Sequence, residues 1–126
     1  METIKQKQIG ELVKRHFSLA LQEEGGYIYG SAPLVTVTSV KMSPDLSLAK
    51  IYLSIYNTEN KQEVILEMEE EKTRLRQLLA TRLRRLVRRV PEIDFYLDDT
   101  LDEMARLQQL FTRLHAENAM GSDSEE

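Results

Sequence analysis

The chain has 126 residues, of which 41% are hydrophobic, and this is enough for one domain with a single core. The lack of cysteine excludes disulfides, zinc–thiolate sites and cysteine nucleophiles, and no apolar run is long enough to span a membrane. The net charge of −4 comes from the last twelve residues, which hold four acids and no Lys or Arg, so acids and bases balance in the rest of the chain. The N-terminus lacks a signal-peptide pattern, and we expect a cytoplasmic protein.

An amphipathic helix is predicted over residues 3–23. Its apolar residues follow i, i+3, i+4, i+7 spacing, which places them on one helical face. The members of this face are Ile9, Leu12, Val13, His16, Phe17, Ala20 and Leu21. Gly25 and Gly26 end the helix, and a loop rich in Gly, Ser and Pro follows.

Two strands joined by a tight turn are predicted next. Residues 34–42 are rich in β-branched side chains, and residues 48–56 alternate between apolar and polar positions. Pro44 and Asp45 supply the turn, because proline fixes φ and aspartate can bond its own backbone. The pattern predicts an antiparallel hairpin with one buried face. The side chains expected on that face are Ile51, Leu53 and Ile55.

A helical region is predicted over residues 60–90, with an interruption near its middle. An unbroken helix would place Lys72 inside the apolar stripe and Leu66 opposite it. We therefore predict a kink between Glu69 and Thr73. Pro91 ends the region, because the residue before a proline disfavours the helical conformation.

The second half of this region carries a row of arginines. They are Arg74, Arg76, Arg82, Arg84, Arg85, Arg88 and Arg89. On a continuous helix to Val90 the leucines and valines share one face and most of the arginines share another. The apolar face would contain Leu75, Leu79, Leu83, Leu86, Val87 and Val90.

The arginine row requires a physical reason, because like-charged pairs at i,i+4, such as Arg84 with Arg88, cost a helix roughly 0.2–0.5 kcal/mol each. One interpretation is a solvated face whose charge is neutralised by acids from elsewhere in the fold. The other, which we favour, is a phosphate-binding face, since guanidinium groups pair bidentately with phosphate and stay charged at any relevant pH.

The last predicted elements are a strand and a helix. Residues 93–97 alternate and predict a third strand. Thr100 and Glu103 match a capping box that begins an amphipathic helix to about residue 116, with Met104 and Phe111 in the core. We expect residues 118–126 to be a disordered acidic tail.

The order of elements predicts the topology. A hairpin is antiparallel, and a strand that returns through a long helical crossover joins its sheet in parallel. The sequence therefore predicts an α+β fold with a three-stranded mixed sheet and helices packed on one face. Residues 1–117 would form this single domain, followed by the tail of residues 118–126.

Two segments resemble the ribosome-binding factor A family. Residues 37–52, VTSVKMSPDLSLAKIY, are similar to the family pattern V-x-V-S-x-D-L-x-x-A-K-V-Y, and residues 88–95, RRVPEIDF, are similar to R-x-V-P-E-L-x-F. The resemblance extends in consistent order over about residues 7–115. The family has an Ala-x-Gly at the helix kink, but here Glu71, Lys72 and Thr73 occupy these positions, without the alanine or the glycine.

The resemblance implies a type II KH-like fold, no catalytic activity, and no cofactor or metal. It also implies a bacterial, monomeric protein that binds 16S ribosomal RNA in the immature 30S subunit and assists late RNA processing and folding, with no membrane and no small-molecule substrate. We expect the phosphate contacts to come from the seven arginines, extended on the hairpin by Lys41 and Lys50.

Two other functions are compatible with the same residues. The arginine row could dock an acidic protein surface, which would make the chain a ribosome-associated adaptor of KH-like fold. Asp98, Asp99 and Asp102 could hold Mg²⁺ in a hydrolase. Acids are also favoured in a turn and at the start of a helix, however, so the enzyme interpretation is the weakest of the three.

Overall fold

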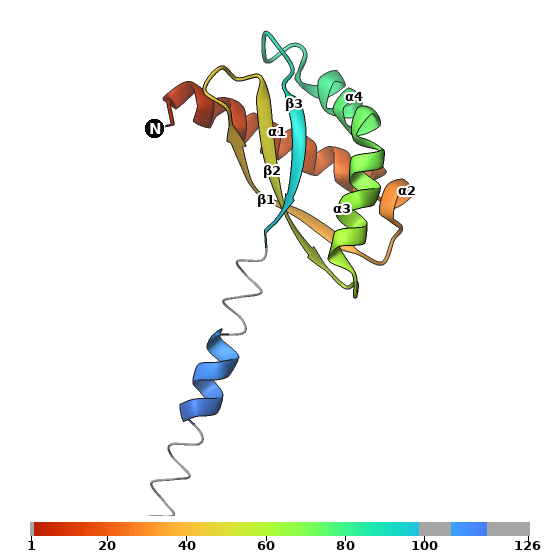
Figure 1. Ribbon diagram of the computed structural model, residues 1–126. Coiled ribbons are helices and arrows are strands. Elements are labelled where there is room, and N and C mark those ends of the chain that lie inside the picture. Colours follow the sequence, from red (N-terminus) through yellow and green to blue (C-terminus); the bar gives the residue numbers. More distant parts are fainter. Residues whose placement is uncertain (1, 99–106, 116–126) are drawn as a thin grey trace, which may run out of the picture.

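The computed structural model describes residues 2–98 and 107–115. The elements follow the predicted order except for one short helix in the segment that was predicted to be a loop, and Figure 1 shows their arrangement. They are α1 (Ile4–Glu24), α2 (Gly26–Tyr29), β1 (Leu34–Met42), β2 (Leu48–Tyr56), α3 (Lys61–Glu70), α4 (Lys72–Leu83) and β3 (Glu92–Leu97). Residues 107–115 are also helical.

The three strands form one mixed sheet in the order β1-β2-β3. β1 pairs antiparallel with β2, and β3 joins the other side of β2 in parallel, as the long helical crossover predicts. A bulge at Thr38 shifts the register of β1. The Thr38 hydroxyl lies 3.2 Å from the Tyr52 carbonyl oxygen and 2.6 Å from Asp98 Oδ2, so the bulged residue connects β1 with the end of β3.

One face of the sheet is buried against the helices. Ile51, Leu53 and Ile55 of β2 are buried as predicted, and they belong to one core cluster with residues of α1, α3, α4 and β3. Figure 1 shows α1 passing behind the strands, with α3 and α4 following one another beside β3. The predicted α+β architecture, with helices on one face of a three-stranded mixed sheet, is confirmed.

The start of α1 is fixed to β1 at close range. Thr3 and Gln6 form a capping box, and the Gln6 side-chain amide also donates to the Met42 carbonyl oxygen at 3.0 Å. One turn further on, a Cβ atom added to Gly10 would lie 3.1 Å from the Val40 carbonyl oxygen. Glycine at this position lets the helix approach the strand closely.

The predicted kink lies between α3 and α4. α3 ends at Glu70, Glu71 leaves the helical conformation with φ −101° and ψ 18°, and α4 begins at Lys72. The failure of helical phase in the sequence therefore marked a true break, even though neither alanine nor glycine is present.

The end of α4 contradicts the prediction. The helix stops at Leu83 rather than Val90, and Leu86 is 53% exposed instead of buried. Arg76 donates to the carbonyl oxygens of Val90 and Pro91, at 3.1 and 3.2 Å. A continuous helix would place residues 76 and 90 about 21 Å apart, beyond the reach of an arginine side chain. Hydrogen bonding of the returning chain, together with repulsion among the arginines, favours the loop.

The C-terminal helix is confirmed only in part. Residues 107–115 are helical, but Phe111 is 67% exposed, so the prediction that it fills the core is wrong. Met104, the Thr100–Glu103 capping box and the predicted acidic tail lie outside the described residues. The domain boundary at residue 117 stays a prediction.

Candidate nucleic-acid interface

The seven arginines divide into two groups, and the first group is neutralised within the fold. Arg74 pairs with Glu24 at 2.9 Å, Arg82 pairs with Glu23 at 2.6 Å, and Arg76 lies 3.3 Å from a carboxylate oxygen of Glu92. These acids come from the end of α1 and the start of β3. The interpretation of a helix face neutralised by distant acids therefore describes these three arginines.

We did not predict which acids pair with the arginines of α4, although the sequence contains a signal for two of them. Glu23 and Glu24 lie in the last turn of α1, where the negative end of the helix dipole disfavours acids. Two unfavourable acids at a helix end indicate cationic partners elsewhere in the fold. The long run of arginines was the obvious source of such partners.

The second group, which we call the arginine loop, consists of Arg84, Arg85, Arg88 and Arg89. All four follow the end of α4 and are exposed. Among the residues that the structure describes, none of the four has a carboxylate within ion-pair distance. The uncompensated charge of the seven arginines is thus concentrated in a short loop, and it does not extend along a helical face as the sequence predicted.

Lys41 and Lys50 lie opposite each other on β1 and β2, on the outer face of the sheet. Both are exposed, and the Lys41 ammonium lies 5.7 Å from the centre of the Tyr52 ring. Tyr52 in turn stacks on Tyr96 of β3, with ring centres 5.4 Å apart. Like charges directly opposite each other destabilise a sheet, and a bound anion would relieve this cost.

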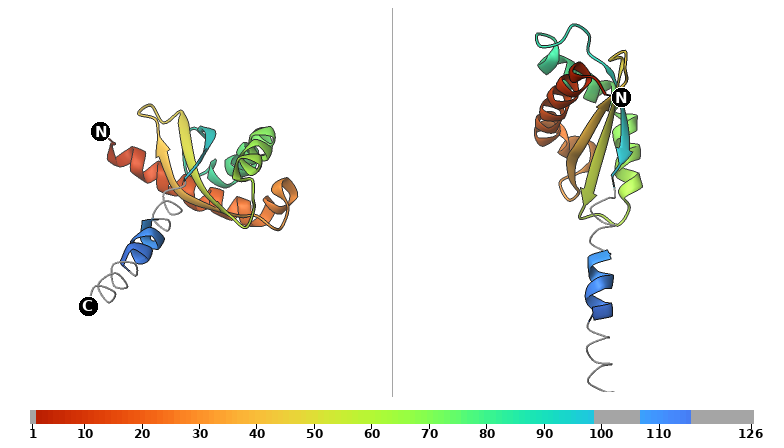
Figure 2. Two further views of the ribbon diagram at one scale, coloured as in Figure 1. Left: turned by 60° about the horizontal axis from the view of Figure 1, so that its bottom comes forward. Right: turned by 90° about the vertical axis from the view of Figure 1, so that its left-hand side faces the viewer.

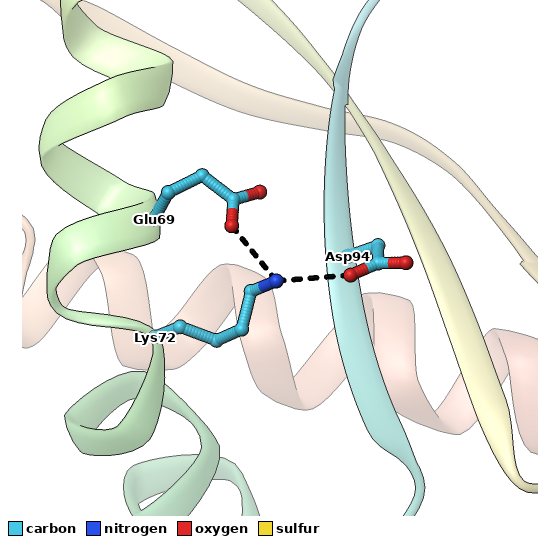
Figure 3. A network of polar contacts seen from close by, with 3 residues as sticks. All are labelled: Glu69, Lys72 and Asp94. Atoms are coloured by element: carbon cyan, nitrogen blue, oxygen red, sulfur yellow. Dashed lines mark hydrogen bonds and ion pairs between the residues drawn. The ribbon is translucent and has the colours of Figure 1, made fainter.

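One of the kink residues, Lys72, forms ion pairs with other parts of the fold. The Lys72 ammonium lies 2.8 Å from Glu69 and 2.9 Å from Asp94, so it joins the α3–α4 junction to β3 (Figure 3). Burial alone lowers the pKa of Lys72, but hydrogen bonds and charges from both carboxylates outweigh it and raise the pKa above its ordinary value. Lys72 is thus a structural cation. Its neighbours Glu71 and Thr73, at the positions where the Ala-x-Gly was missing from the sequence, are both exposed.

The enzyme interpretation gains no geometric support. Asp98 contacts the Thr38 hydroxyl, whereas Asp99 and Asp102 lie outside the described residues. Within residues 2–98 and 107–115 no cluster of His, Asp or Glu side chains could hold a metal ion. No helix in the same ranges has the length and apolarity needed to cross a membrane.

Comparisons with known proteins place this geometry in context. The family model of ribosome-binding factor A matches residues 5–111. A relative of that name from Cytophaga hutchinsonii is 35% identical over 114 residues, which is 90% of this chain and 85% of the relative. Another from Christiangramia forsetii is 36% identical over 101 residues, 80% of this chain and 77% of the relative.

Solved structures with the same name share the fold. The crystal structure from Thermus thermophilus has a TM-score of 0.60 at 23% identity, over 73% of this chain and 94% of that one. A solution structure of a Thermotoga maritima protein has a TM-score of 0.57 at 23% identity, over 76% and 89% of the two chains. A Thermus thermophilus homology model fitted into a map of a 30S complex has a TM-score of 0.56 at 24% identity, over 71% and 91%. The predicted type II KH-like fold is confirmed.

Proposed function

Because this chain belongs to the ribosome-binding factor A family, we propose that it binds 16S ribosomal RNA in the immature 30S subunit and assists late processing and folding of that RNA. The Thermus thermophilus relative fitted into a 30S complex supports the small subunit as the partner. The cytoplasm, where these subunits mature, is then the place of action. The observation that carries the proposal for this chain is the uncompensated charge of the arginine loop.

The arginine loop would act by neutralising RNA phosphates. Guanidinium groups form paired hydrogen bonds with phosphate oxygens, and such contacts fix the position of a protein without reading the base sequence. Specificity would then come from the shape of a folded RNA. Arg74, Arg76 and Arg82 contribute less, because each would first have to leave its own carboxylate.

Co-sedimentation with isolated 30S, 50S and 70S particles at two salt concentrations tests the proposal. We expect binding to 30S particles that weakens with salt, and about four phosphate contacts give a slope of about −3 for log K against log[salt] on the single-strand coefficient. The double variant Arg85→Gln, Arg88→Gln should bind more weakly and halve that slope. The matched control Arg74→Gln, Arg82→Gln removes the same charge from paired positions and should change the slope by less than one.

Two outcomes would overturn the proposal. The first is binding to 30S particles that does not respond to salt or to the Arg85/Arg88 variant. The second is binding that persists in the presence of excess free RNA, because an adaptor for an acidic protein surface would ignore that competitor.

A further inference from the structure

A hollow of about 520 Å³ opens where three segments meet. The segments are the start of α1, the turn between β1 and β2, and the loop that follows α4. In Figure 1 and in the right-hand view of Figure 2 these three segments lie together at the upper end of the molecule. The lining residues are Lys5, Ile9, Asp45, Leu46, Leu86, Val87, Arg88 and Arg89.

The charge lining this hollow favours an anion. Lys5, Arg88 and Arg89 are exposed, and within the described part of the chain none has an ion-pair partner. The single acid, Asp45, is committed to the turn, because its Oδ1 accepts from the Ser47 amide and hydroxyl and from the Ser43 hydroxyl, at 2.7 to 3.1 Å. Among the described residues, the lining therefore carries three cations without an ion pair and one carboxylate that already accepts three hydrogen bonds.

The rest of the lining is apolar and partly uncovered. Leu86 is 53% exposed, although its helical spacing in the sequence predicted a buried position. Ile9, Leu46 and Val87 are half-buried and pack against the core from the hollow side. A phosphate alone would leave this apolar surface in water. A flat, weakly polar ring would cover it.

We propose, on the premise that the chain binds RNA, that this hollow receives one unstacked nucleotide of the bound strand. Its phosphate pairs with Lys5, Arg88 and Arg89, and its base lies against Leu86 over the other apolar side chains. The volume fits the range of about 300–1,000 Å³ that is usual for small-ligand sites, where apolar walls surround a few placed polar groups. Recognition of splayed-out bases is the usual route to base-dependent RNA binding.

Methyl NMR on the full-length chain tests the proposal directly. The probes are hexaadenylate RNA, an abasic hexamer of the same ribose-phosphate backbone, and hexaglutamate. With hexaadenylate, ring currents should shift the methyl signals of Ile9, Leu46, Leu86 and Val87. The abasic hexamer should bind through its charge and leave these methyl signals nearly unchanged.

A pair of leucine variants provides the matched control. Leu86→Ser should weaken hexaadenylate binding about fivefold, as expected for covering the exposed half of a leucine side chain, and should not affect the abasic hexamer. Leu66→Ser replaces a leucine of similar exposure, 61%, on α3 and should change neither affinity. Because both side chains are exposed, neither variant should unfold the protein.

Three results would overturn the nucleotide site. The first is equal binding of hexaadenylate by Leu86→Ser and by the unaltered chain. The others are methyl signals that stay in place while hexaadenylate binds, and the same methyl shifts with hexaglutamate. Failure of the proposed function can be told apart from failure of the nucleotide site, because the proposed function is tested by binding to 30S particles. If 30S binding remains salt-dependent and sensitive to the Arg85/Arg88 variant while Leu86→Ser has no effect, only the nucleotide site is wrong.

Discussion

Replacing Lys72 by methionine should destabilise the domain by about 1.5 kcal/mol without changing its binding to RNA. Methionine keeps most of the aliphatic stem and removes only the ammonium. The variant therefore loses two ion pairs, to Glu69 and Asp94, and the contact of the ammonium with the Phe95 ring at 5.9 Å. The two carboxylates would then face each other without a cation between them.

The magnitude follows from the exposure of the three side chains. Lys72, Glu69 and Asp94 are each about one-third exposed, at 31%, 35% and 38%. Ion pairs this open to water contribute about 0.2–1 kcal/mol each, and a partly exposed cation over an aromatic ring adds about 0.5–1 kcal/mol. A loss of about 1.5 kcal/mol corresponds to a fall in the melting temperature of about 6 °C in a domain of this size.

Urea unfolding at 50 mM and at 1 M NaCl measures the effect. The difference between Lys72→Met and the unaltered chain should shrink by more than half at 1 M NaCl, where the Debye length is about 3 Å. Lys7→Met is the control, because Lys7 is exposed and has no ion pair within the described ranges, and its stability should change by less than about 0.5 kcal/mol. Equal stability of Lys72→Met and the parent at low salt, or a loss that persists unchanged at 1 M NaCl, would refute the electrostatic role.

Three further predictions concern the packing and the turn. Gly10→Val should cost about 1–3 kcal/mol in urea unfolding, because a side chain there meets the Val40 carbonyl oxygen and separates α1 from β1. Leu79→Ala, at a fully buried position on α4, should cost about 2–5 kcal/mol and lower the thermal midpoint measured by circular dichroism. Hydrogen bonds from the Ser47 hydroxyl and then from the Ser43 hydroxyl lower the pKa of Asp45 from 3.8 to about 2. The hydrogen-bonded form of the turn should therefore be fully populated above pH 3.8 and be lost as the pH falls through about 2. A carbon-13 titration of Asp45 checks this, and Ser47→Ala should move its midpoint upward; an unchanged midpoint would contradict the assignment.

The local parts of the fold could be predicted from the sequence because their causes are local. Alternation over residues 48–56 placed Ile51, Leu53 and Ile55 on the buried face correctly, although Ser54 on the other face is buried too. The structure begins β3 at Glu92, one residue before the prediction. The kink was predictable because Lys72 and Leu66 could not share one continuous helix with the apolar stripe. Periodicity reports which side of an element is buried, and it also reports where one element gives way to another.

The end of α4 and the fate of the arginines could not be predicted, because their causes are distant in sequence. Arg76 bonds a carbonyl group 14 residues later, and Arg82 meets Glu23 at a separation of 59 residues. The leucines after residue 79 keep their helical spacing, so nothing local shows that Leu86 leaves the core. For the candidate site, the sequence identified the seven arginines. Only the tertiary fold showed that three of them form ion pairs and that, in the part of the chain that the structure describes, the four in the arginine loop do not.

The parallel pairing of β3 with β2 has a consequence for the newly synthesised chain. Residues 48–53 of β2 each pair with a residue 44 positions further along the chain, and at about 5–20 residues per second the ribosome needs roughly 2–9 s to synthesise that partner. A hairpin closes in microseconds, so β1 and β2 are paired long before β3 emerges from the ribosome. During that interval one side of β2 has an unpaired row of backbone amides and carbonyls, the kind of edge that recruits other chains. The last strand of the sheet therefore also protects the first two from aggregation.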